Sequence, residues 1–420
     1  MQYHSYSLQN GARVLLVPQK DVKSATVLIM YPVGSRYESD ALQGVSHYVE
    51  HMMFKGTKKR KNTLILTREI DRLGAEYNAF TSKEYTGYYI KTESGYLNVS
   101  LDILSDMLFN SVFDPAEMER EKGPIVEELK MYRDNPVMNI DNVFENLLYA
   151  PSSLGREIGG TDKHVLGYKR PNVLQYRDRY YDVSNMTIVV AGAMPENIRE
   201  MIQKFFGQQK KKKKAQSAFK SYKFGSEAKR ERLCVVHKQT DQAQMMLGFP
   251  AFDYNAKQNV PLAVLNTILG GSFSSRLFIR IRERLGLAYV IRSGQENFRD
   301  IGHSFVRAGL DAKNLNKAIA AILHEISKVV KSGVTKQELA DAKTHMRGGL
   351  MLSLEDSSAQ ANWFAKEALF YRSIQTPDEY LNRIDKVTRE DIQKIAKQVF
   401  NPDKLRIAVI GDIKPESIHF

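Results

Sequence analysis

The stretch His47-Tyr48-Val49-Glu50-His51 holds two of the nine histidines in this 420-residue chain. It lies within residues 40–54, where apolar side chains recur at helical spacing. Residues four apart share one face of a helix, so His47 and His51 can direct two imidazoles at one metal ion. Glu50 lies close to that face. The spacing H-x-x-E-H therefore predicts two metal ligands and a neighbouring carboxylate that activates a water.

The beginning of this helix has a signal of its own. Asp40 followed by Gln43 resembles a capping box, which predicts a helix that begins at Asp40. The alternative to a metal site is an amphipathic helix with two ordinary surface histidines. A third ligand elsewhere in the chain would favour the metal site, because catalytic zinc takes three protein ligands and keeps one position for water.

Glu128 is the candidate third ligand. Asp114-Pro115 combines an N-cap with a proline at the first helical position, and it opens a helix rich in glutamates. Glu121 and Glu128 are seven residues apart, which is two helical turns, so they share a face. Most glutamates in so acidic a helix are solvated, which is the competing interpretation. Gly123-Pro124 conflicts with a regular helix here, because proline removes a backbone donor and introduces a kink.

Length and composition exclude several classes of protein. The chain is 43% hydrophobic and 26% charged, and its 420 residues are enough for two or three domains. Its one cysteine, Cys234, excludes a disulfide framework and a cysteine zinc cluster. No apolar run approaches the length of a membrane span, so no membrane partner is expected. Residues 1–6 lack a signal-peptide core, and the expected location is cytoplasmic.

A large part of the net charge of +13 lies in one segment. Residues 207–226 hold seven lysines and no acidic residue, including the run Lys210–Lys214. Such a run is typical of a solvated linker or of a nucleic-acid tether. We prefer the Lys-rich interdomain linker, because no recognised nucleic-acid module accompanies the run. No nucleic-acid partner is expected.

The second half of the chain repeats the first. Residues 187–192, a buried strand that ends in glycine, are echoed by residues 405–411 at a shift of 219. A helical segment precedes each strand, and a Pro-Glu pair follows each. This order predicts two copies of one α+β module. The expected domains are residues 1–206 and 227–420, joined by the linker.

The metal motif does not recur in the second module. We expect the matching region to be Leu269–Phe278, which holds Gly-Gly-Ser instead of histidines. Its glycines fit neither G-x-G-x-x-G nor the Walker pattern, so no phosphate loop is predicted. Phe278 and Arg282 follow at helical spacing, and Tyr289 lies seven residues after Arg282. Taken by themselves, such residues are usually packing and surface residues.

Together these residues make the chain resemble the pitrilysin and mitochondrial-processing-peptidase family of zinc peptidases, the inverzincins, in its short form. The resemblance covers the whole chain. It implies a single zinc ion per chain held by His47, His51 and Glu128, with Glu50 as the catalytic base. It also implies that Glu121 is a supporting carboxylate. The Gly123-Pro124 pair departs from the aliphatic stretch that is usual in the family.

The same resemblance implies how substrate is bound. Asn78, Ala79, Phe80 and Thr81 look like the substrate-binding edge strand of the family. Arg282 and Tyr289, with Phe278 just ahead, look like its arginine–tyrosine pair, which contacts the substrate and the reacting carbonyl.

The implied fold is α+β, with two homologous modules of antiparallel and mixed sheet flanked by helices that form half of a clamshell. One chain carries both the metal motif and the arginine–tyrosine pair, which favours a homodimer in which the pair acts in trans. The implied activity is that of a zinc metalloendopeptidase acting on peptides or unfolded segments. The alternatives are an inactive scaffold subunit and a processing peptidase with one dedicated substrate.

Overall fold

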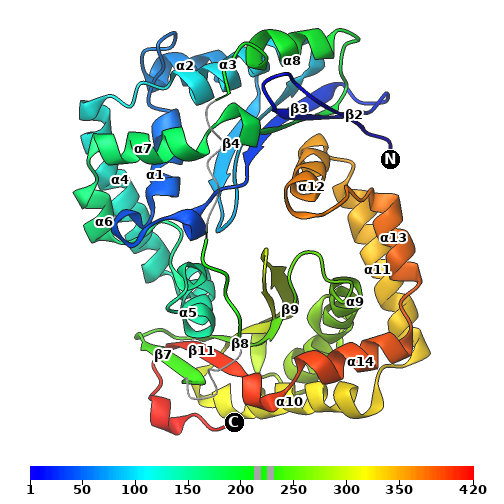
Figure 1. Cartoon of the computed structure of the whole chain (residues 1–420). Coiled ribbons are helices and arrows are strands. Elements are labelled where there is room, and N and C mark those ends of the chain that lie inside the picture. The colour runs from blue at the N-terminus through cyan, green and yellow to red at the C-terminus, as the bar shows by residue number, and fades with distance from the viewer. Residues whose placement is uncertain (212–218, 225–230) are drawn as a thin grey trace. The chain divides into compact units, whose positions relative to one another are not determined.

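The structure is a computed structural model that describes residues 1–211, 219–224 and 231–420 (Figure 1). Part of the expected linker, including Lys212 to Lys214, therefore lies outside the described residues. The chain packs into two compact units. Unit 1 comprises Met1–Lys130, Arg156–Phe219 and Leu352–Thr376, and unit 2 comprises Met131–Gly155, Lys220–Met351 and Pro377–Phe420.

Both units are discontinuous in sequence. Unit 1 takes in a segment from the second repeat, and unit 2 takes in a segment from the first. The domain boundaries at residues 206 and 227 stay a prediction about the repeats, whereas packing divides the chain differently. Among the described residues, no helix combines the length and apolarity that crossing a membrane requires.

Unit 1 is built on a six-stranded mixed sheet with the order β1-β2-β6-β3-β5-β4. β2 and β6 are parallel, and the other neighbours are antiparallel. The sequence alternates as a strand does over residues 12–18 and 25–33, which predicts two strands, and these form β2 and β3. The strand bounds are β1 His4–Ser7, β2 Arg13–Pro18, β3 Ser24–Tyr31, β4 Glu76–Thr81, β5 Thr86–Glu93 and β6 Thr187–Gly192.

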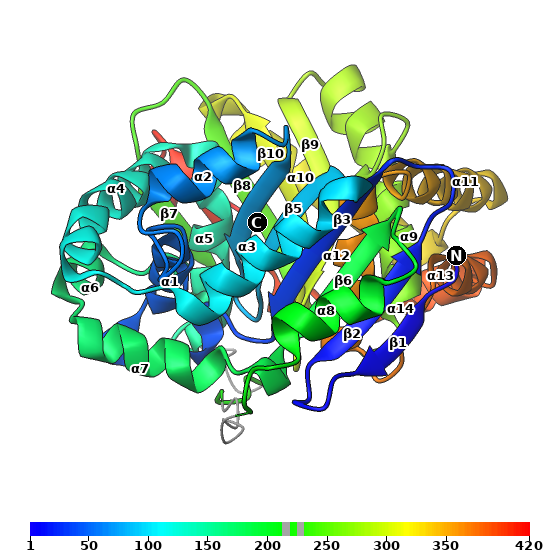
Figure 2. The same cartoon turned by 90° about the horizontal axis from the view of Figure 1, so that it is seen from above.

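Helices cover both faces of this sheet (Figure 2). Alternate residues of the central strands enter two different cores, as the two-residue period of a strand requires. One core contains side chains of α1, α3 and α8, and the other contains side chains of α12. The helix bounds are α1 Val45–Met53, α2 Thr63–Asp71, α3 Leu97–Asn110, α4 Pro115–Asp134, α6 Asp162–Gly167, α7 Arg170–Tyr180, α8 Ile198–Phe206 and α12 Ser357–Phe370.

Unit 2 has a five-stranded mixed sheet with the order β7-β11-β8-β10-β9. α5 packs on one face, and the other helices form the core on the opposite face. Its strands are β7 Leu233–His237, β8 Ala243–Ala251, β9 Ala288–Asn297, β10 Gly302–Leu310 and β11 Arg406–Gly411. Its helices are α5 Pro136–Tyr149, α9 Asn259–Gly270, α10 Leu315–Ser332, α11 Lys336–Ser353, α13 Pro377–Asp385 and α14 Arg389–Val399.

The two sheets have the same topology, as two copies of one module require. The order β2-β6-β3-β5-β4 of unit 1 corresponds to β7-β11-β8-β10-β9 of unit 2, and every pair keeps its direction. α1 follows β3 just as α9 follows β8. The expectation that Leu269–Phe278 matches the metal helix is therefore wrong. The counterpart is α9, which ends where that region begins.

Candidate metal centre

The helix that carries the two histidines begins later than the sequence predicts. Residues Asp40–Leu42 form a short 3-10 turn, and α1 begins at Val45 with Gly44 as its N-cap. Gly44 has a φ of 88°, which favours glycine, and it has no side chain with which to cap the helix. The prediction that Asp40 and Gln43 cap the helix is therefore wrong, because their segment is a separate 3-10 turn and α1 begins only at Val45.

Glu38 supplies the cap instead. Its carboxylate accepts the backbone N–H of Gly44 at 2.7 Å and that of Ser46 at 2.8 Å. Side-chain oxygens that accept from the first free N–H groups stabilise the start of a helix. No local pattern in the sequence indicates this contact, because glutamate is not a usual capping residue and Glu38 lies six residues before the N-cap.

Three donor atoms converge at one point of unit 1. His47 Nε2 lies 3.2 Å from His51 Nε2. The Glu128 carboxylate reaches both rings, with Oε1 at 3.6 Å from His47 Nε2 and Oε2 at 3.3 Å from His51 Nε2. Tetrahedral zinc, with ligands at about 2.0–2.2 Å, holds its donors about 3.3 Å apart. The residue types and the spacing of the three donors therefore fit zinc.

A second carboxylate fixes the tautomer of one histidine. Glu121 Oε1 lies 2.9 Å from His51 Nδ1, so a proton on Nδ1 leaves the Nε2 lone pair free for a metal. Lys55 Nζ lies 2.5 Å from the other oxygen of Glu121 and balances its charge. The sequence predicted Glu121 in this supporting place but not Lys55, whose partner is distant in the chain.

The charges of this cluster are strongly coupled. Burial alone would lower the pKa of His51, but hydrogen bonds with Glu121 and Glu128 outweigh it and raise the pKa to about 9. Hydrogen bonds from His47 and His51 hold the pKa of Glu128 far below its usual range. The site therefore combines ionised carboxylates with a positive charge. Such a cluster suits a divalent cation, which would replace the proton on His51.

Glu50 lies beside the three donors in a different environment. It is mostly buried, and burial raises its pKa against the opposing effects of Thr81, His47 and His51. Thr81 Oγ1 donates a hydrogen bond to Glu50 Oε2. A carboxylate whose pKa is raised is a stronger base, which suits a group that accepts a proton.

Thr81 ends β4, the strand that the sequence singled out for substrate binding. β4 is the edge strand of the unit 1 sheet, and in the described part of the chain it pairs only with β5. Asn78 is exposed and Ala79 is buried, while Phe80 and Thr81 are half-buried. The position at a free edge is what strand addition requires, and the binding role of these residues stays a prediction.

The helix that carries Glu121 and Glu128 forms as its start signal predicts. Asp114 Oδ1 accepts the N–H groups of Ala116 and Glu117, and Pro115 is the first helical residue. α4 runs on to Asp134 with Gly123-Pro124 inside it, so the conflict seen in the sequence does not end the helix. Both glutamates therefore reach α1 from one helix.

Arg282 and its aromatic neighbours lie together in unit 2. Residues Phe278–Arg284 form a π-helical turn. The Arg282 guanidinium carbon lies 4.7 Å from the centre of the Phe278 ring and 5.3 Å from that of Tyr289. Tyr289 is the second residue of β9, the edge strand of its sheet, and is 69% exposed. Phe278, Arg282 and Tyr289 thus lie together, with Arg282 in contact with both aromatic rings. The Phe273 ring also meets Phe278 edge-on, with their ring centres 5.0 Å apart.

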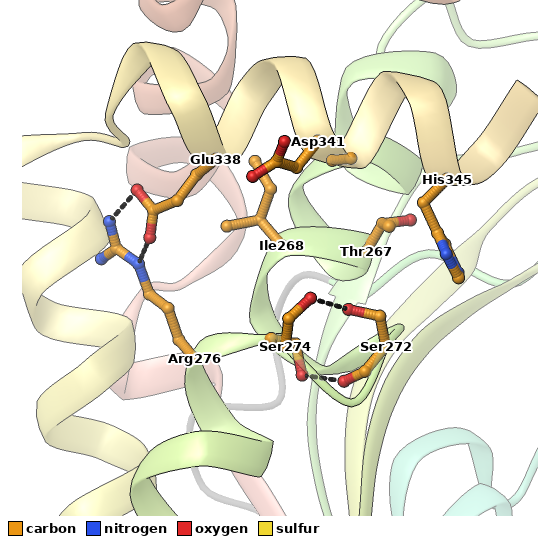
Figure 3. Close-up of a pocket in the computed structure, with 10 residues that line it drawn as sticks. Thr267, Ile268, Ser272, Ser274, Arg276, Glu338, Asp341 and His345 are labelled. Atoms are coloured by element: carbon orange, nitrogen blue, oxygen red, sulfur yellow. Dashed lines mark hydrogen bonds and ion pairs between the residues drawn. The ribbon is translucent and has the colours of Figure 1, made fainter.

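Unit 2 also has a small pocket of about 110 Å³ between the end of α9 and α11 (Figure 3). Serine hydroxyls line one side, where Ser272 Oγ and Ser274 Oγ are 3.2 Å apart. Arg276 closes one end through two hydrogen bonds to Glu338, at 2.6 and 2.8 Å (Figure 3). Arg276 is thereby neutralised, so the pocket does not present a free guanidinium to an anion.

Comparisons with known proteins agree with this geometry. Residues 13–162 match the family model described as insulinase (peptidase family M16), and residues 168–346 match the peptidase M16 inactive domain. An uncharacterized zinc protease of Bacillus subtilis (strain 168) is 35% identical over 398 residues, which are 95% of this chain and 96% of that protein. Another, from Streptomyces coelicolor, is 32% identical over 411 residues, 97% of this chain and 89% of that protein.

Solved structures show the same fold. A protease from Helicobacter pylori superimposes with a TM-score of 0.90 at 23% identity, covering 98% of this chain and 99% of that one. A putative M16-like peptidase from Alicyclobacillus acidocaldarius gives 0.85 at 19% identity, covering 97% and 98%.

A duplicated α+β module with an H-x-x-E-H helix and a distant glutamate defines the peptidases with the inverted zinc motif. The chain belongs to one family of that class, peptidase family M16. The inactive-domain model covers most of unit 2, in line with the expectation of one metal site per chain.

Proposed function

We propose that this protein is a zinc-dependent metalloendopeptidase that hydrolyses peptides or unfolded polypeptide segments. The observation that carries the proposal is the convergence of His47, His51 and Glu128, whose donor atoms all lie within 4.8 Å of one another, with Glu50 beside them. A bound zinc ion supplies a Lewis acid and lowers the pKa of a water at its open position. Side chains of the protein itself transfer the protons, orient the ligands and bind the substrate.

Glu50 takes the proton of the attacking water and later delivers it to the leaving amine. Its burial serves this role, because a raised pKa makes the carboxylate a better proton acceptor. The hydrogen bond from Thr81 to Oε2 orients the carboxylate and leaves Oε1 for the water. Glu121 keeps the His51 ring in the tautomer that the metal needs.

The substrate lies along β4 as an added strand. The free edge of β4 offers backbone donors and acceptors, which read an extended peptide more by its main chain than by its sequence. Thr81 is the last residue of that strand and also contacts Glu50, so the edge leads directly to the catalytic base. Flexible peptides and unfolded segments can adopt the extended form that this contact requires.

Tyr289 and Arg282 stabilise the charge that develops on the reacting carbonyl oxygen. They belong to unit 2, whereas the metal ligands belong to unit 1. We propose a homodimer in which this pair completes the site of the partner subunit. The single cysteine suits a reducing compartment, such as the cytoplasm.

The variant Glu50→Gln tests the catalytic assignment. We expect peptide cleavage to fall by about 10²–10⁴-fold, because the general base is lost, while the zinc content stays unchanged. Purified protein is incubated with a mixed peptide library, with and without a chelator, and cut sites are read by mass spectrometry. Glu127→Gln is the matched control, since Glu127 lies on the same helix as Glu128 but is exposed and pairs with Lys130.

Two outcomes would overturn the proposal. Cleavage by the Glu50→Gln variant at the wild-type rate would remove Glu50 from the mechanism. Wild-type protein that binds peptides but shows no chelator-sensitive cleavage would favour the inactive scaffold subunit.

A further inference from the structure

The first turn of α1 carries one of the two zinc-type histidines. His47 is the third residue of the helix, whereas His51 lies one turn further along. The first N–H groups of a helix have no partner within it, so this turn frays unless something outside holds it. Gly44, the N-cap, cannot do so, because it has no side chain. The position of His47 therefore depends on contacts from other segments.

Glu38 makes the decisive contact. Its side chain is buried, and each carboxylate oxygen accepts one hydrogen bond. Oε2 accepts from the N–H of Gly44, and Oε1 accepts from the N–H of Ser46. The Ser46 hydroxyl lies 2.7 Å from the hydroxyl of Tyr176 on α7, so the turn is also tied to a second helix. A carboxylate at the start of a helix also interacts favourably with the helix dipole.

A glycine loop closes the other side of the turn. Gly160 has a φ of 74°, and a Cβ there would lie 2.3 Å from the carbonyl oxygen of Gln43. A Cβ on Gly44 would lie 2.2 Å from the carbonyl oxygen of Gly159. The backbones are thus in direct contact. The first turn lies between this loop and the Glu38 carboxylate, with little space in which to shift.

We propose that Glu38 is a positioning residue of the metal centre, which holds the first turn of α1 so that His47 Nε2 stays beside His51 Nε2 and thereby sets the zinc affinity. Glu38 acts on the site through its contacts with Gly44 and Ser46 and not as one of the three donors. The inference rests on the zinc ligation in the proposed function, but not on peptide cleavage.

The test is a graded pair of variants. Glu38→Gln keeps the shape of the side chain and one accepting oxygen, so one N–H loses its partner. Glu38→Ala removes both acceptors. We expect the zinc dissociation constant to rise about tenfold for Glu38→Gln and about 100-fold for Glu38→Ala, the range seen when supporting contacts of metal sites are removed. Zinc affinity is measured by competition with a chromophoric chelator.

Asn62→Ala is the matched control. Asn62 caps α2 in the same unit by accepting the N–H of Ile65 at 3.0 Å. Its loss removes the cap of a helix that carries none of the zinc ligands, so zinc affinity should stay within about twofold of wild type. Hydrogen exchange on the zinc-free proteins adds a local readout. Residues 44–48 should exchange faster in both Glu38 variants, and residues 63–71 should do so only in Asn62→Ala.

The outcomes are distinguishable. Failure of the wild-type protein to bind zinc would overturn the proposed function as well. If wild type binds zinc and Glu38→Gln binds it equally well with unchanged exchange at residues 44–48, only the role of Glu38 is overturned. If Glu38→Ala does not fold, Glu38→Gln alone decides. If Asn62→Ala lost as much zinc affinity as the Glu38 variants, the loss would reflect general destabilisation of unit 1, and the inference would be overturned.

Discussion

The two units share one topology, but the helix that follows β3 in unit 1 carries different residues from the helix that follows β8 in unit 2. At the third, sixth and seventh positions, α1 of unit 1 carries His47, Glu50 and His51, and α9 of unit 2 carries Pro261, Val264 and Leu265. Val264 and Leu265 are fully buried, whereas His47 and His51 keep 14% and 24% of their side-chain surface exposed. The same scaffold position thus serves as core in one unit and as a candidate metal centre in the other.

The second contributing helix shows the same contrast. Glu121 and Glu128 lie six and thirteen residues after the first residue of α4. At the same distances from its first residue, α11 carries Ala342 and Gly349. By this count, small residues stand in α11 where the acidic residues of the site stand in α4. A duplicated module can lose its chemistry without losing its fold, because the sheet and its apolar residues carry the stability.

The largest expected effect concerns the residues of unit 2 that we propose to act in catalysis. Tyr289→Phe should lower kcat by about 10²–10³-fold, because the donor to the developing oxyanion is lost, and should leave zinc content unchanged. Mixing this variant with Glu50→Gln should restore roughly a quarter of wild-type activity if a dimer exchanges subunits and the tyrosine acts in trans.

The mixing experiment has its own control. Each inactive variant mixed with wild type gives only the activity expected from dilution. No recovery in the mixture of the two variants, after subunit exchange has been verified, would contradict action in trans.

A reciprocal exchange of residues between the two helices should give unequal costs. Leu265→His places a polar ring in the core of unit 2 and should lower the free energy of unfolding by about 3 kcal/mol. His51→Leu should abolish zinc binding but cost about 1 kcal/mol or less in the zinc-free protein at about pH 10, where His51, with its pKa of about 9, no longer holds the proton that Glu121 and Glu128 stabilise.

Both stabilities are measured by urea unfolding in the presence of a chelator, followed by circular dichroism. Equal losses in the two variants would contradict the distinction between a core helix and a site helix.

The smallest expected effects are two opposite pH dependences. In unit 1, burial raises the pKa of Glu38 from 4.5 to about 7, against the hydrogen bonds from Ser46 and Gly44. In unit 2, burial of Glu338 acts in the same direction, but hydrogen bonds from Arg276 and Thr335 bring its pKa down from 4.5 to about 2. Stability from Glu38 is complete below pH 4.5 and is lost as the pH rises through about 7. That from Glu338 is present above pH 4.5 and is lost as the pH falls through about 2.

Glutamine variants isolate these two groups. As the pH rises from about 5 to 8, the free energy of unfolding of Glu38→Gln should increase by about 2 kcal/mol relative to that of wild type, because only wild type loses stability as Glu38 ionises. Glu338→Gln should gain about 1 kcal/mol relative to wild type as the pH falls from about 6 to 3, a smaller change because Glu338 is partly exposed. Unfolding midpoints across pH measure both differences. Gains that appear in the same direction of pH change in the two variants would contradict the assignment.

Local patterns in the sequence were enough to predict several parts of the structure. The apolar runs at 12–18 and 25–33 form β2 and β3, because strands covered on both faces are continuously apolar. Asp114-Pro115 begins α4, and Glu121 and Glu128 share one face of that helix because two helical turns separate them. The spacing H-x-x-E-H places His47 and His51 within 3.2 Å of each other for the same reason. These are properties of single segments.

Long-range contacts account for what the sequence analysis missed. The start of α1 depends on Glu38 and on the Gly159-Gly160 loop, and no local pattern predicts where a distant loop packs. The exchange of segments between the repeats, in which α5 packs in unit 2 and α12 in unit 1, is equally invisible in sequence order. The mistaken match of Leu269–Phe278 arose because the counterpart helix α9 retains none of the residues that mark α1.

The sequence by itself determined the duplicated module, the two-histidine helix and the residues that could join it, since each rests on the period of a helix or strand. Only the tertiary structure decided that Glu128 is the glutamate that meets both histidines and that Glu121 turns to His51 and Lys55. It also decided that Glu38 holds the turn before His47. The physical reason is that spacing defines a face of one helix, whereas packing alone selects what that face meets.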